Sequence, residues 1–222
     1  MKIGIITYDR PHRKTQDVLH GLHEIGYKKI KLIVSKFRKF KNKKIKNFFE
    51  HRPDQFNGPS IKEISGYYDL SVCNLDDKNI YRNLDIVLIC GSAIINNNLI
   101  KKNFVINCHS GLIPLTRGLD AFKWAILEKK LIGTTLHYID ENVDLGKIIS
   151  HEKTPFFKSD TIKRFAKRHY NAEVNMLTNF EYHLNNPKIL NLETCQANMR
   201  MPINLEKKMY KMYNNYKRYI LK

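Results

Sequence analysis

Residues 1–35, MKIGIITYDRPHRKTQDVLHGLHEIGYKKIKLIVS, decide the fold class because they predict a strand, a loop, a helix and a second strand. Ile3 to Thr7 and Ile30 to Val34 are apolar and rich in β-branched residues, which is typical of strands. Between them, Lys14 to Ile25 repeats apolar residues at helical spacing. Two strands joined through a helix are typical of a parallel sheet, so we expect an α/β fold.

Predicted strands and helices continue along the rest of the chain. Leu84 to Cys90 is nearly all apolar, which predicts a strand buried on both faces, and the short run Phe104 to Asn107 predicts another. The expected later elements are a helix at Leu119–Lys130, extended stretches at Gly133–Ile139 and Lys147–His151, and a helix capped by Ser159 or Asp160 that runs through Leu177.

The length of 222 residues, with 42% hydrophobic and 27% charged residues, is typical of one globular domain. No apolar run approaches the roughly 18 residues that would span a bilayer, and the first strand is too short for a signal peptide. Cys73, Cys90, Cys108 and Cys195 are widely separated, so we expect reduced thiols, no metal site and a cytoplasmic location.

The net charge of +18 predicts attraction for phosphates. A nucleic acid, a nucleotide and a phosphorylated metabolite all fit, and so does a basic surface that merely solvates the protein. The run Lys36 to Lys46 is too basic to pack, so we expect a loop or a loosely held helix there.

Three polar side chains at strand ends can support acyl transfer. Asn107 and His109 surround the end of the strand after Phe104, and Asp144 lies in the turn before Lys147. An amide can donate to a carbonyl oxygen, a histidine can act as a general acid or base, and a carboxylate can orient the imidazole. In open parallel sheets, ligands bind at this edge.

The sequence around these residues contains four segments in a fixed order. They are NCHSGLIP at Asn107–Pro114, Arg117–Gly118, GTTLHY at Gly133–Tyr138 and DENVDLGKII at Asp140–Ile149. The set resembles the formyltransferase family, whose pattern is Asn-x-His with a Leu-Leu-Pro-like loop, a Gly-x-Thr-x-His strand and an Asp-x-Gly-x-Ile-Ile turn. The resemblance is strong from about Ile86 to Ile149.

The resemblance implies a Rossmann-like formyltransferase domain, with a mostly parallel twisted sheet flanked by helices, that uses 10-formyltetrahydrofolate to formylate an amine. It implies that Asn107 holds the formyl oxygen, that His109 stabilises the developing oxyanion and handles protons, and that Asp144 assists both. It also implies a pteridine pocket lined by Gly91, Ser92, Ala93, Ile94, Ile95, Ile139, Asp140, Glu141 and Val143.

Within this family, the loop from Tyr8 to Lys14 differs from the Gly- and Ser-rich phosphate loop of the purine enzymes. The chain after Asn185 is too short for the additional domain of methionyl-tRNA formyltransferases. The resemblance is therefore greatest to enzymes that formylate a dTDP- or UDP-linked deoxyamino sugar for a cell-surface glycan such as lipopolysaccharide O-antigen. The expected substrate-binding residues are Tyr8, Arg10, Arg13, Lys14, Arg52 and Arg117, and Phe56 is a candidate to stack on the base.

Two other functions stay open. The acceptor amine can belong to an aminoacyl-tRNA or a ribonucleotide, or the basic segments can bind nucleic acid without catalysis. We assign residues 1–185 to the catalytic domain and 186–222 to a basic helical extension. In the extension Leu205, Met209, Met212, Tyr216 and Tyr219 form an apolar seam that predicts docking onto the domain, or self-association into a homodimer.

Overall fold

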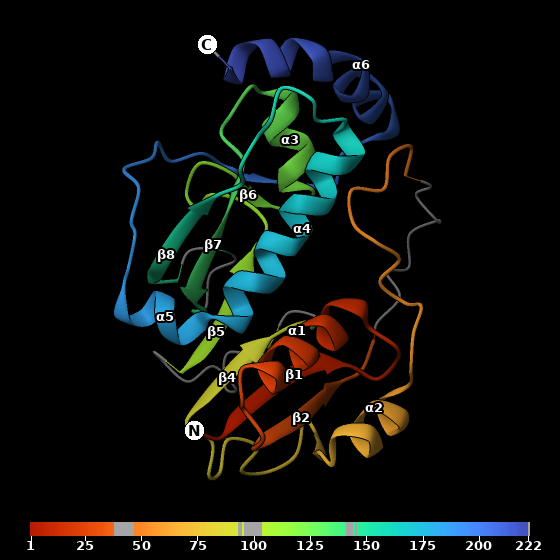
Figure 1. Ribbon diagram of the computed structural model, residues 1–222, viewed down its shortest axis with the longest axis vertical. Coiled ribbons are helices and arrows are strands. Elements are labelled where there is room, and N and C mark those ends of the chain that lie inside the picture. The colour runs from red at the N-terminus through yellow and green to blue at the C-terminus, as the bar shows by residue number, and fades with distance from the viewer. Residues whose placement is uncertain (38–46, 93–94, 96–103, 141–143, 145, 222) are drawn as a thin grey trace.

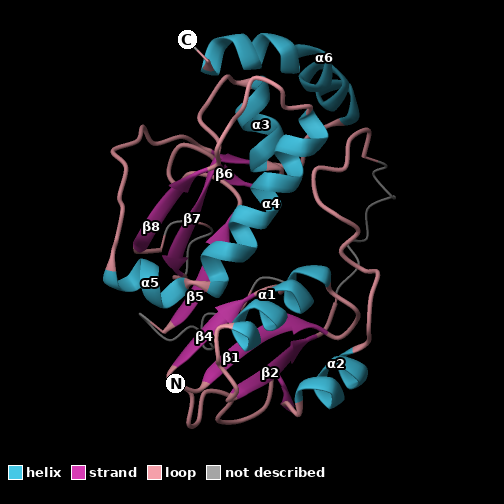
Figure 2. Cartoon of the chain, viewed as in Figure 1, coloured by secondary structure: helices cyan, strands magenta, loops and turns pink. Residues whose placement is uncertain are grey.

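The computed structural model of the chain describes residues 1–37, 47–92, 95, 104–140, 144 and 146–221. Within them, seven strands form one mixed sheet flanked by helices (Figures 1 and 2). The strands are β1 (Ile3–Tyr8), β2 (Ile30–Ser35), β3 (Ser71–Asn74), β4 (Ile86–Ile89), β5 (Val105–His109), β7 (Gly133–Tyr138) and β8 (Ile148–Lys153). The order is β3-β2-β1-β4-β5-β7-β8. The first five of these strands are parallel, β7 pairs antiparallel with β5, and β8 pairs antiparallel with β7 and so runs in the direction of the first five; this confirms the expected Rossmann-like fold.

Helices cover the faces of the sheet, and others lie beyond one end of it (Figure 1). They are α1 (Arg13–Glu24), α2 (Ile61–Tyr68), α3 (Ala121–Leu127), α4 (Ile162–Thr178), α5 (Phe180–Asn185) and α6 (Ile203–Ile220). In Figure 1, α1 and α4 cross the same face of the sheet, and α3 and α6 lie beyond its end. The two helices approach closely at Gly21, where a Cβ atom would lie 2.8 Å from the side chain of Thr178.

Side-chain alternation along the central strands divides the core into two layers. Ile5 of β1 packs in the layer that also contains Leu22 of α1 and Leu177 of α4. The next residue, Ile6, packs on the opposite face with Val87 of β4 and Val105 of β5. This period of two buries both faces of the parallel strands, as their continuous apolar runs predict.

Five elements and one helix start differ from the sequence expectations. Helix α5 and two strands of two residues each, at Arg117–Gly118 and Ala197–Asn198, were not predicted. Helix α2 and strand β3 were not predicted, because both are short and largely exposed. A capping box starts α2, in which Ser60 and Glu63 bond each other's backbone N–H groups. Helix α4 is capped by Thr161, not by Ser159 or Asp160, since the Asp160 carboxylate instead accepts from Phe157 N and pairs with Arg168.

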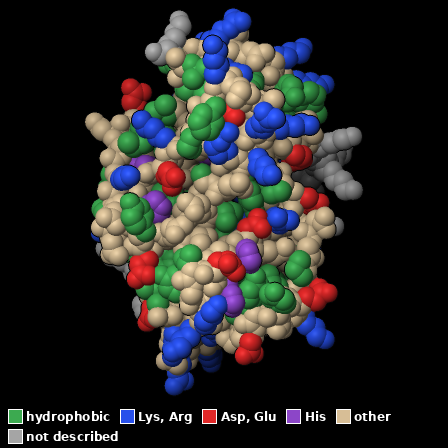
Figure 3. Space-filling view, in the orientation of Figure 1, with side chains coloured by type: hydrophobic (Ala, Val, Ile, Leu, Met, Phe, Trp, Pro, Cys, Tyr) green, Lys and Arg blue, Asp and Glu red, His purple; other side chains and the backbone are tan. Residues whose placement is uncertain are grey.

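The C-terminal helix α6 docks on its own domain. It packs against α3, with Met209, Tyr213 and Tyr216 buried at the contact, while Tyr219 of the predicted seam is 54% exposed. The buried stripe follows the helical period and so includes Tyr213, which a strict heptad seam omits. The outer face is basic, and Figure 3 shows Lys and Arg side chains gathered at this end of the molecule.

A second, two-stranded sheet joins the C-terminal segment to the middle of the chain. In it β6 (Arg117–Gly118) pairs in parallel with β9 (Ala197–Asn198). None of the helices in the described ranges combines the length and hydrophobicity needed to cross a membrane.

Candidate active site

The last residues of β5 present two polar side chains on one face of the sheet. Ile106 and Cys108 point into the core beside α1 and α4, so alternation turns Asn107 and His109 to the opposite face. His109 is 8% exposed, and Asn107 is partly exposed. The carboxyl end of β5 therefore brings an amide and an imidazole to the edge where ligands bind in such sheets.

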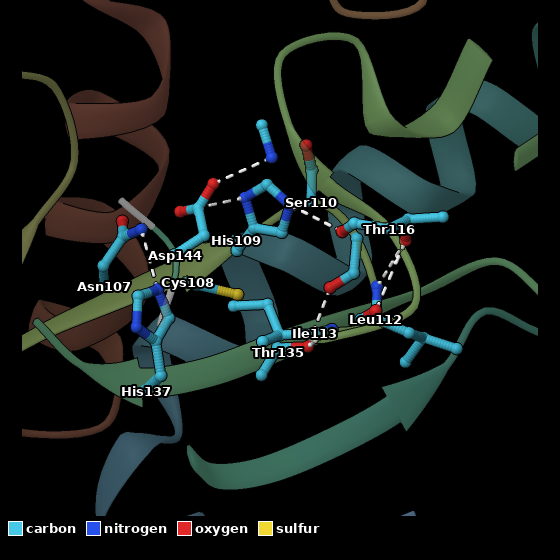
Figure 4. Close-up of polar contacts among 12 residues, drawn as sticks. Asn107, Cys108, His109, Ser110, Leu112, Ile113, Thr116, Thr135, His137 and Asp144 are labelled. Atoms are coloured by element: carbon cyan, nitrogen blue, oxygen red, sulfur yellow. Dashed lines mark hydrogen bonds and ion pairs between the residues drawn. The ribbon is translucent and has the colours of Figure 1, made fainter. Parts of the chain in front are cut away.

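Asp144 comes from a distant turn to meet His109. Its Oδ1 atom lies 3.5 Å from His109 Nδ1, and the other oxygen, Oδ2, accepts a 3.0 Å hydrogen bond from Gly118 N (Figure 4). The Asp144 backbone adopts φ 52°, a left-handed conformation that is uncommon outside glycine and concentrates at functional sites. The structure thus brings together Asn107, His109 and Asp144, as Figure 4 shows.

The second nitrogen of His109 is also bonded. Nε2 lies 3.0 Å from the Thr116 carbonyl oxygen, which can only accept, so Nε2 carries a proton. Nδ1, the atom that faces Asp144, is then protonated only in the imidazolium form. In the imidazolium form, His109 can stabilise negative charge on a reacting oxygen.

The loop from Gly111 to Thr116 holds this acceptor in place. Thr135 Oγ1 donates to Gly111 O and accepts from Ile113 N, and Thr116 Oγ1 accepts from Leu112 N. A Cβ atom at position 111 would lie 2.5 Å from Thr116 O and 2.8 Å from His109 Nε2. Glycine is therefore required at position 111, directly before Leu112-Ile113-Pro114.

His137 is a site residue to which the sequence reasoning assigned no role, although it ends the Gly-x-Thr-x-His motif. It lies on β7 opposite Asn107, and its Nε2 is 3.2 Å from Asn107 Nδ2. Burial and the nearby His109 lower the pKa of His137 to about 4. A neutral imidazole at this position can accept from the amide and hold it in one orientation.

The residues expected around a pteridine are only partly described. Ala93, Ile94, Glu141 and Val143 lie outside the described residues. Ile95 packs in the core cluster of Ile6 and Val87, and Ile139 packs against the same cluster while its N–H donates to Val105 O. Asp140 follows Ile139, two residues after the end of β7.

Gly91 and Ser92 sit against the end of β1. Tyr8 Oη donates to Ser92 O at 2.8 Å, and a Cβ atom on Gly91 would lie 2.7 Å from the His12 ring. Ser92 Oγ is buried and has no hydrogen-bond partner among the described residues. A buried hydroxyl without a partner is a candidate hydrogen-bonding group for a polar ligand, so the role of Gly91 and Ser92 in a pteridine pocket stays a prediction.

Arg10 and three aromatic rings form a cluster at the ends of β1 and β2. The Arg10 guanidinium stacks on Phe37 at 3.9 Å and lies 5.7 Å from the Phe56 ring centroid, while Tyr8 contacts Phe37 edge to face. Arg10 Nε is buried without a hydrogen-bond partner among the described residues. This cluster combines flat apolar rings with a cation, as a nucleotide requires.

The other predicted substrate residues have different surroundings. Lys14 is 4% exposed and its Nζ lies 2.6 Å from Glu173 Oε1, so it belongs to the protein interior. Arg52 pairs with Glu173 Oε2 at 2.7 Å. Burial alone would raise the pKa of Glu173, but Arg52 and Lys14 lower it to about 2. Arg13 pairs with Asp17 on the surface of α1, and Arg117 lies in β6.

Comparison with known proteins agrees with this geometry. Residues 80–180 match the profile of a family described as formyl transferase. The chain is 32% identical over 122 residues to the trifunctional purine biosynthetic protein adenosine-3 of Chironomus tentans, covering 53% of this chain and 8% of that protein. It is 30% identical over 89 residues to the phosphoribosylglycinamide formyltransferase of Haemophilus influenzae, covering 38% of this chain and 42% of that enzyme. The chain thus spans less than half the length of these curated relatives.

The fold is similar to that of a solved structure with bound ligands. An N-formyltransferase from Helicobacter canadensis, in complex with folinic acid and dTDP-3-aminofucose, superimposes with a TM-score of 0.65. The similarity covers 97% of this chain and 82% of that one at 17% identity. At this identity the likeness establishes the shared fold.

Proposed function

We propose that this chain, a member of the formyl transferase family across residues 80–180, transfers a formyl group from 10-formyltetrahydrofolate to the amino group of a nucleotide-linked deoxyamino sugar. The observation that carries the proposal is the meeting of Asn107, His109 and Asp144 at the carboxyl end of β5. Family membership supports the formyl transfer, and the surroundings of β1 support the class of acceptor.

Asn107 supplies a hydrogen-bond donor for the formyl oxygen. Its amide nitrogen carries two hydrogens, and His137 uses only one of them. The second hydrogen can donate to the oxygen on which charge develops as the amine attacks. Such fixed donors lower the barrier because they need no reorganisation during the reaction.

His109 and Asp144 manage charge and protons. In its imidazolium form, His109 places a positive charge beside the reacting centre, with the carboxylate of Asp144 next to its Nδ1 atom. The free amine attacks the formyl carbon, and its nitrogen, now ammonium-like, loses a proton to the neighbouring carboxylate of Asp144. As the tetrahedral centre collapses, the bond between the formyl carbon and the folate nitrogen breaks, and that nitrogen takes up a proton. Neither step needs a covalent bond to the protein.

The acceptor class follows from the cluster of Tyr8, Arg10, Phe37 and Phe56. Aromatic rings suit a nucleobase, and the unbonded Nε of Arg10 suits a phosphate oxygen. The solved N-formyltransferase of Helicobacter canadensis contains dTDP-3-aminofucose, which supports an acceptor of the same class. The product would then enter cell-surface glycan synthesis in the cytoplasm. That the protein forms a homodimer also stays a prediction.

The test is a formyl-transfer assay with purified protein, 10-formyltetrahydrofolate and a panel of dTDP- and UDP-linked amino sugars. We expect turnover with at least one of these sugars. The variants Asn107→Ala, His109→Ala and Asp144→Ala should each lower kcat by roughly a hundred- to a thousandfold. Near wild-type turnover in His109→Ala would overturn the mechanism.

A second candidate acceptor is favoured by the relatives at the sequence level, which include phosphoribosylglycinamide formyltransferase. The same assay with glycinamide ribonucleotide and with methionyl-tRNA distinguishes these acceptors. Turnover with either of them, and with no nucleotide sugar, would refute the acceptor class proposed here. Tight, steeply salt-dependent binding of a generic oligonucleotide without turnover would instead indicate a nucleic-acid-binding protein.

A further inference from the structure

The chain between α5 and α6 returns to the catalytic side of the molecule. After α5, Lys188 and Leu190 bond to β8 through Ser150 and His151. The chain then reaches β6, where Ala197 and Asn198 form β9 (Figure 1). We call residues 195–201 the C-terminal segment.

The C-terminal segment is bonded to residues 114–124 at four points. Cys195 N donates to Pro114 O at 3.1 Å, and Leu119 N donates to Asn198 O at 2.8 Å. Trp124 Nε1 donates to Met199 O, and Met201 N donates to the carboxylate of Asp120.

Residues 114–124, to which the C-terminal segment is bonded, also supply the hydrogen-bond partners of His109 and Asp144. The Thr116 carbonyl accepts from His109 Nε2 at 3.0 Å. The Gly118 N–H donates to Asp144 Oδ2 at 3.0 Å. One layer of backbone therefore separates the C-terminal segment from both side chains.

Gly118 is the point of closest approach. Its φ is +81°, and a Cβ atom there would lie 2.2 Å from Asn198 O and 2.7 Å from Asn198 N. Strand β9 thus runs directly against the Gly118 backbone, on which the position of one carboxylate oxygen of Asp144 depends. Since the next residue, Leu119, donates to Asn198 O, β9 sets the direction in which the neighbouring Gly118 N–H points.

The C-terminal segment is itself anchored in the core. Met201 is fully buried in the cluster of α3, α4 and α6. One turn into α6, Glu206 is buried against Lys123 of α3 and accepts from Phe48 N and Phe49 N. The anchor makes the C-terminal segment a rigid support.

We propose that β9 is a positioning element of the catalytic centre, which holds Gly118 and Thr116 so that the carboxylate of Asp144 stays beside Nδ1 of His109. The inference rests on the proposed function for the reaction that the pair performs. The positional claim about Gly118, Asp144 and His109 is independent of the acceptor.

The first test is a proline in β9. Asn198→Pro removes a backbone N–H from the strand and fixes its φ, which is incompatible with regular pairing. Thr194→Pro is the matched control, because Thr194 is exposed and lies directly before the C-terminal segment, outside the β6–β9 pair. We expect Asn198→Pro to lower kcat by roughly tenfold or more, because small misplacement of catalytic groups has effects of this size. KM values for both substrates should stay within about twofold of wild type, since uniform binding is unaffected.

A double-mutant cycle separates positioning from general damage. In an Asp144→Asn background, Asn198→Pro should cost much less in kcat than it does in wild type, since the group it positions is already impaired. An equal loss in both backgrounds would overturn the proposal. So would a properly folded Asn198→Pro protein with unchanged kcat.

A second readout does not depend on the acceptor. In protein labelled with ¹⁵N-histidine, the His109 ring signals are assigned by their loss in His109→Gln. We expect these signals to move in Asn198→Pro and to stay in place in Thr194→Pro. Unchanged His109 signals in Asn198→Pro refute the proposal, even if the protein proves to have another acceptor or no formyl-transfer activity.

A milder variant covers the case in which Asn198→Pro does not fold. Trp124→Phe keeps an aromatic ring on α3 but removes the donor to Met199 O. We expect Trp124→Phe to lower kcat by less than Asn198→Pro does. In the Asp144→Asn background, the loss caused by Trp124→Phe should be smaller still. A fall in melting temperature with kcat and the His109 signals unchanged would make the C-terminal segment a purely structural element and refute the inference.

Discussion

The side-chain amide of Asn107 lies 3.2 Å from Nε2 of His137, and Nδ1 of the same imidazole lies 3.1 Å from the Tyr138 carbonyl oxygen. A carbonyl oxygen can only accept, so the proton of neutral His137 is on Nδ1 and Nε2 accepts from the amide. This arrangement fixes the amide with its nitrogen toward β7. The orientation of the proposed formyl-oxygen donor is therefore set by a buried histidine on the neighbouring strand.

His137→Leu should lower kcat by roughly tenfold, because it frees the Asn107 amide to rotate while keeping an apolar side chain in the buried site. KM should change little, since ground-state binding does not need the amide in one orientation. Steady-state kinetics with the identified acceptor measures this. His183→Leu, a change of the same kind on α5, is the control, and an equal loss there would contradict a specific role for His137.

Asp144→Asn should reduce kcat by roughly a hundred- to a thousandfold without unfolding the protein. The amide keeps a contact with Gly118 N through its oxygen, but it can neither accept the proton of the attacking amine nor place a negative charge beside His109. Kinetics and thermal unfolding are measured on the same preparation. A variant that keeps wild-type kcat would show that the carboxylate charge is not needed.

Arg10→Ala should raise KM for the nucleotide-linked acceptor by roughly ten- to a hundredfold, the effect of losing a charged hydrogen bond to phosphate. We expect kcat to change less, since a phosphate contact is present in both ground and transition states. Arg13→Ala serves as the comparison, because the Arg13 side chain is 51% exposed and already pairs with Asp17. A loss confined to kcat in Arg10→Ala would contradict a phosphate-binding role.

Glu173→Gln should destabilise the fold by about 3–5 kcal/mol, because it leaves the buried Lys14 cation without its charged partner. Replacing both residues, as Lys14→Met with Glu173→Gln, should recover part of that loss. Denaturant unfolding gives both values. Glu128→Gln, which breaks the more exposed pair with Lys130, should cost no more than about 1 kcal/mol, and a similar cost for both single variants would contradict this account.

Acid should destabilise the protein well above the pH at which carboxylates titrate. Burial lowers the pKa of His169 to about 4 and that of His12 to about 3, against an ordinary value of 6.5. Between these values the unfolded chain binds more protons than the folded one. The stability from a neutral buried histidine is therefore complete above about pH 6.5 and is lost as the pH falls toward the folded pKa.

Measuring the unfolding free energy between roughly pH 7 and pH 4.5 tests this, with a slope of up to about 1.4 kcal/mol per pH unit for each such group. His169→Gln should reduce the slope, whereas His20→Gln on the exposed face of α1 should not. A slope unchanged by His169→Gln would refute the assignment.

The sequence was sufficient for elements whose residue pattern is itself the cause of the structure. The apolar runs of β1, β2 and β4 and the helical spacing of α1 predicted a parallel sheet, which the structure confirms. Elements held mainly by local capping were missed. Helix α2 buries only Ile64, so it has almost no apolar stripe, and its visible signal was the capping box at Ser60 and Glu63.

The proposed site divides in the same way. Motif order alone pointed to Asn107, His109 and Asp144, because those residue types at strand ends suit one kind of chemistry. Lys14 shows the limit of such reasoning. Its position beside the β1 loop suggested phosphate binding, but only the packing of α4 brings Glu173, 159 residues away, against its ammonium group.

By itself, then, the chain's order of residues was sufficient to predict the sheet and its parallel centre, which depend on spacing over a few residues, and to propose Asn107, His109 and Asp144 as the site from the order of four motifs. Tertiary structure alone decided which charges are buried together, that His137 orients Asn107, and that β9 lies against Gly118. These relationships join residues far apart in the chain, and their energies depend on burial and on hydrogen-bond direction. No local pattern records either quantity.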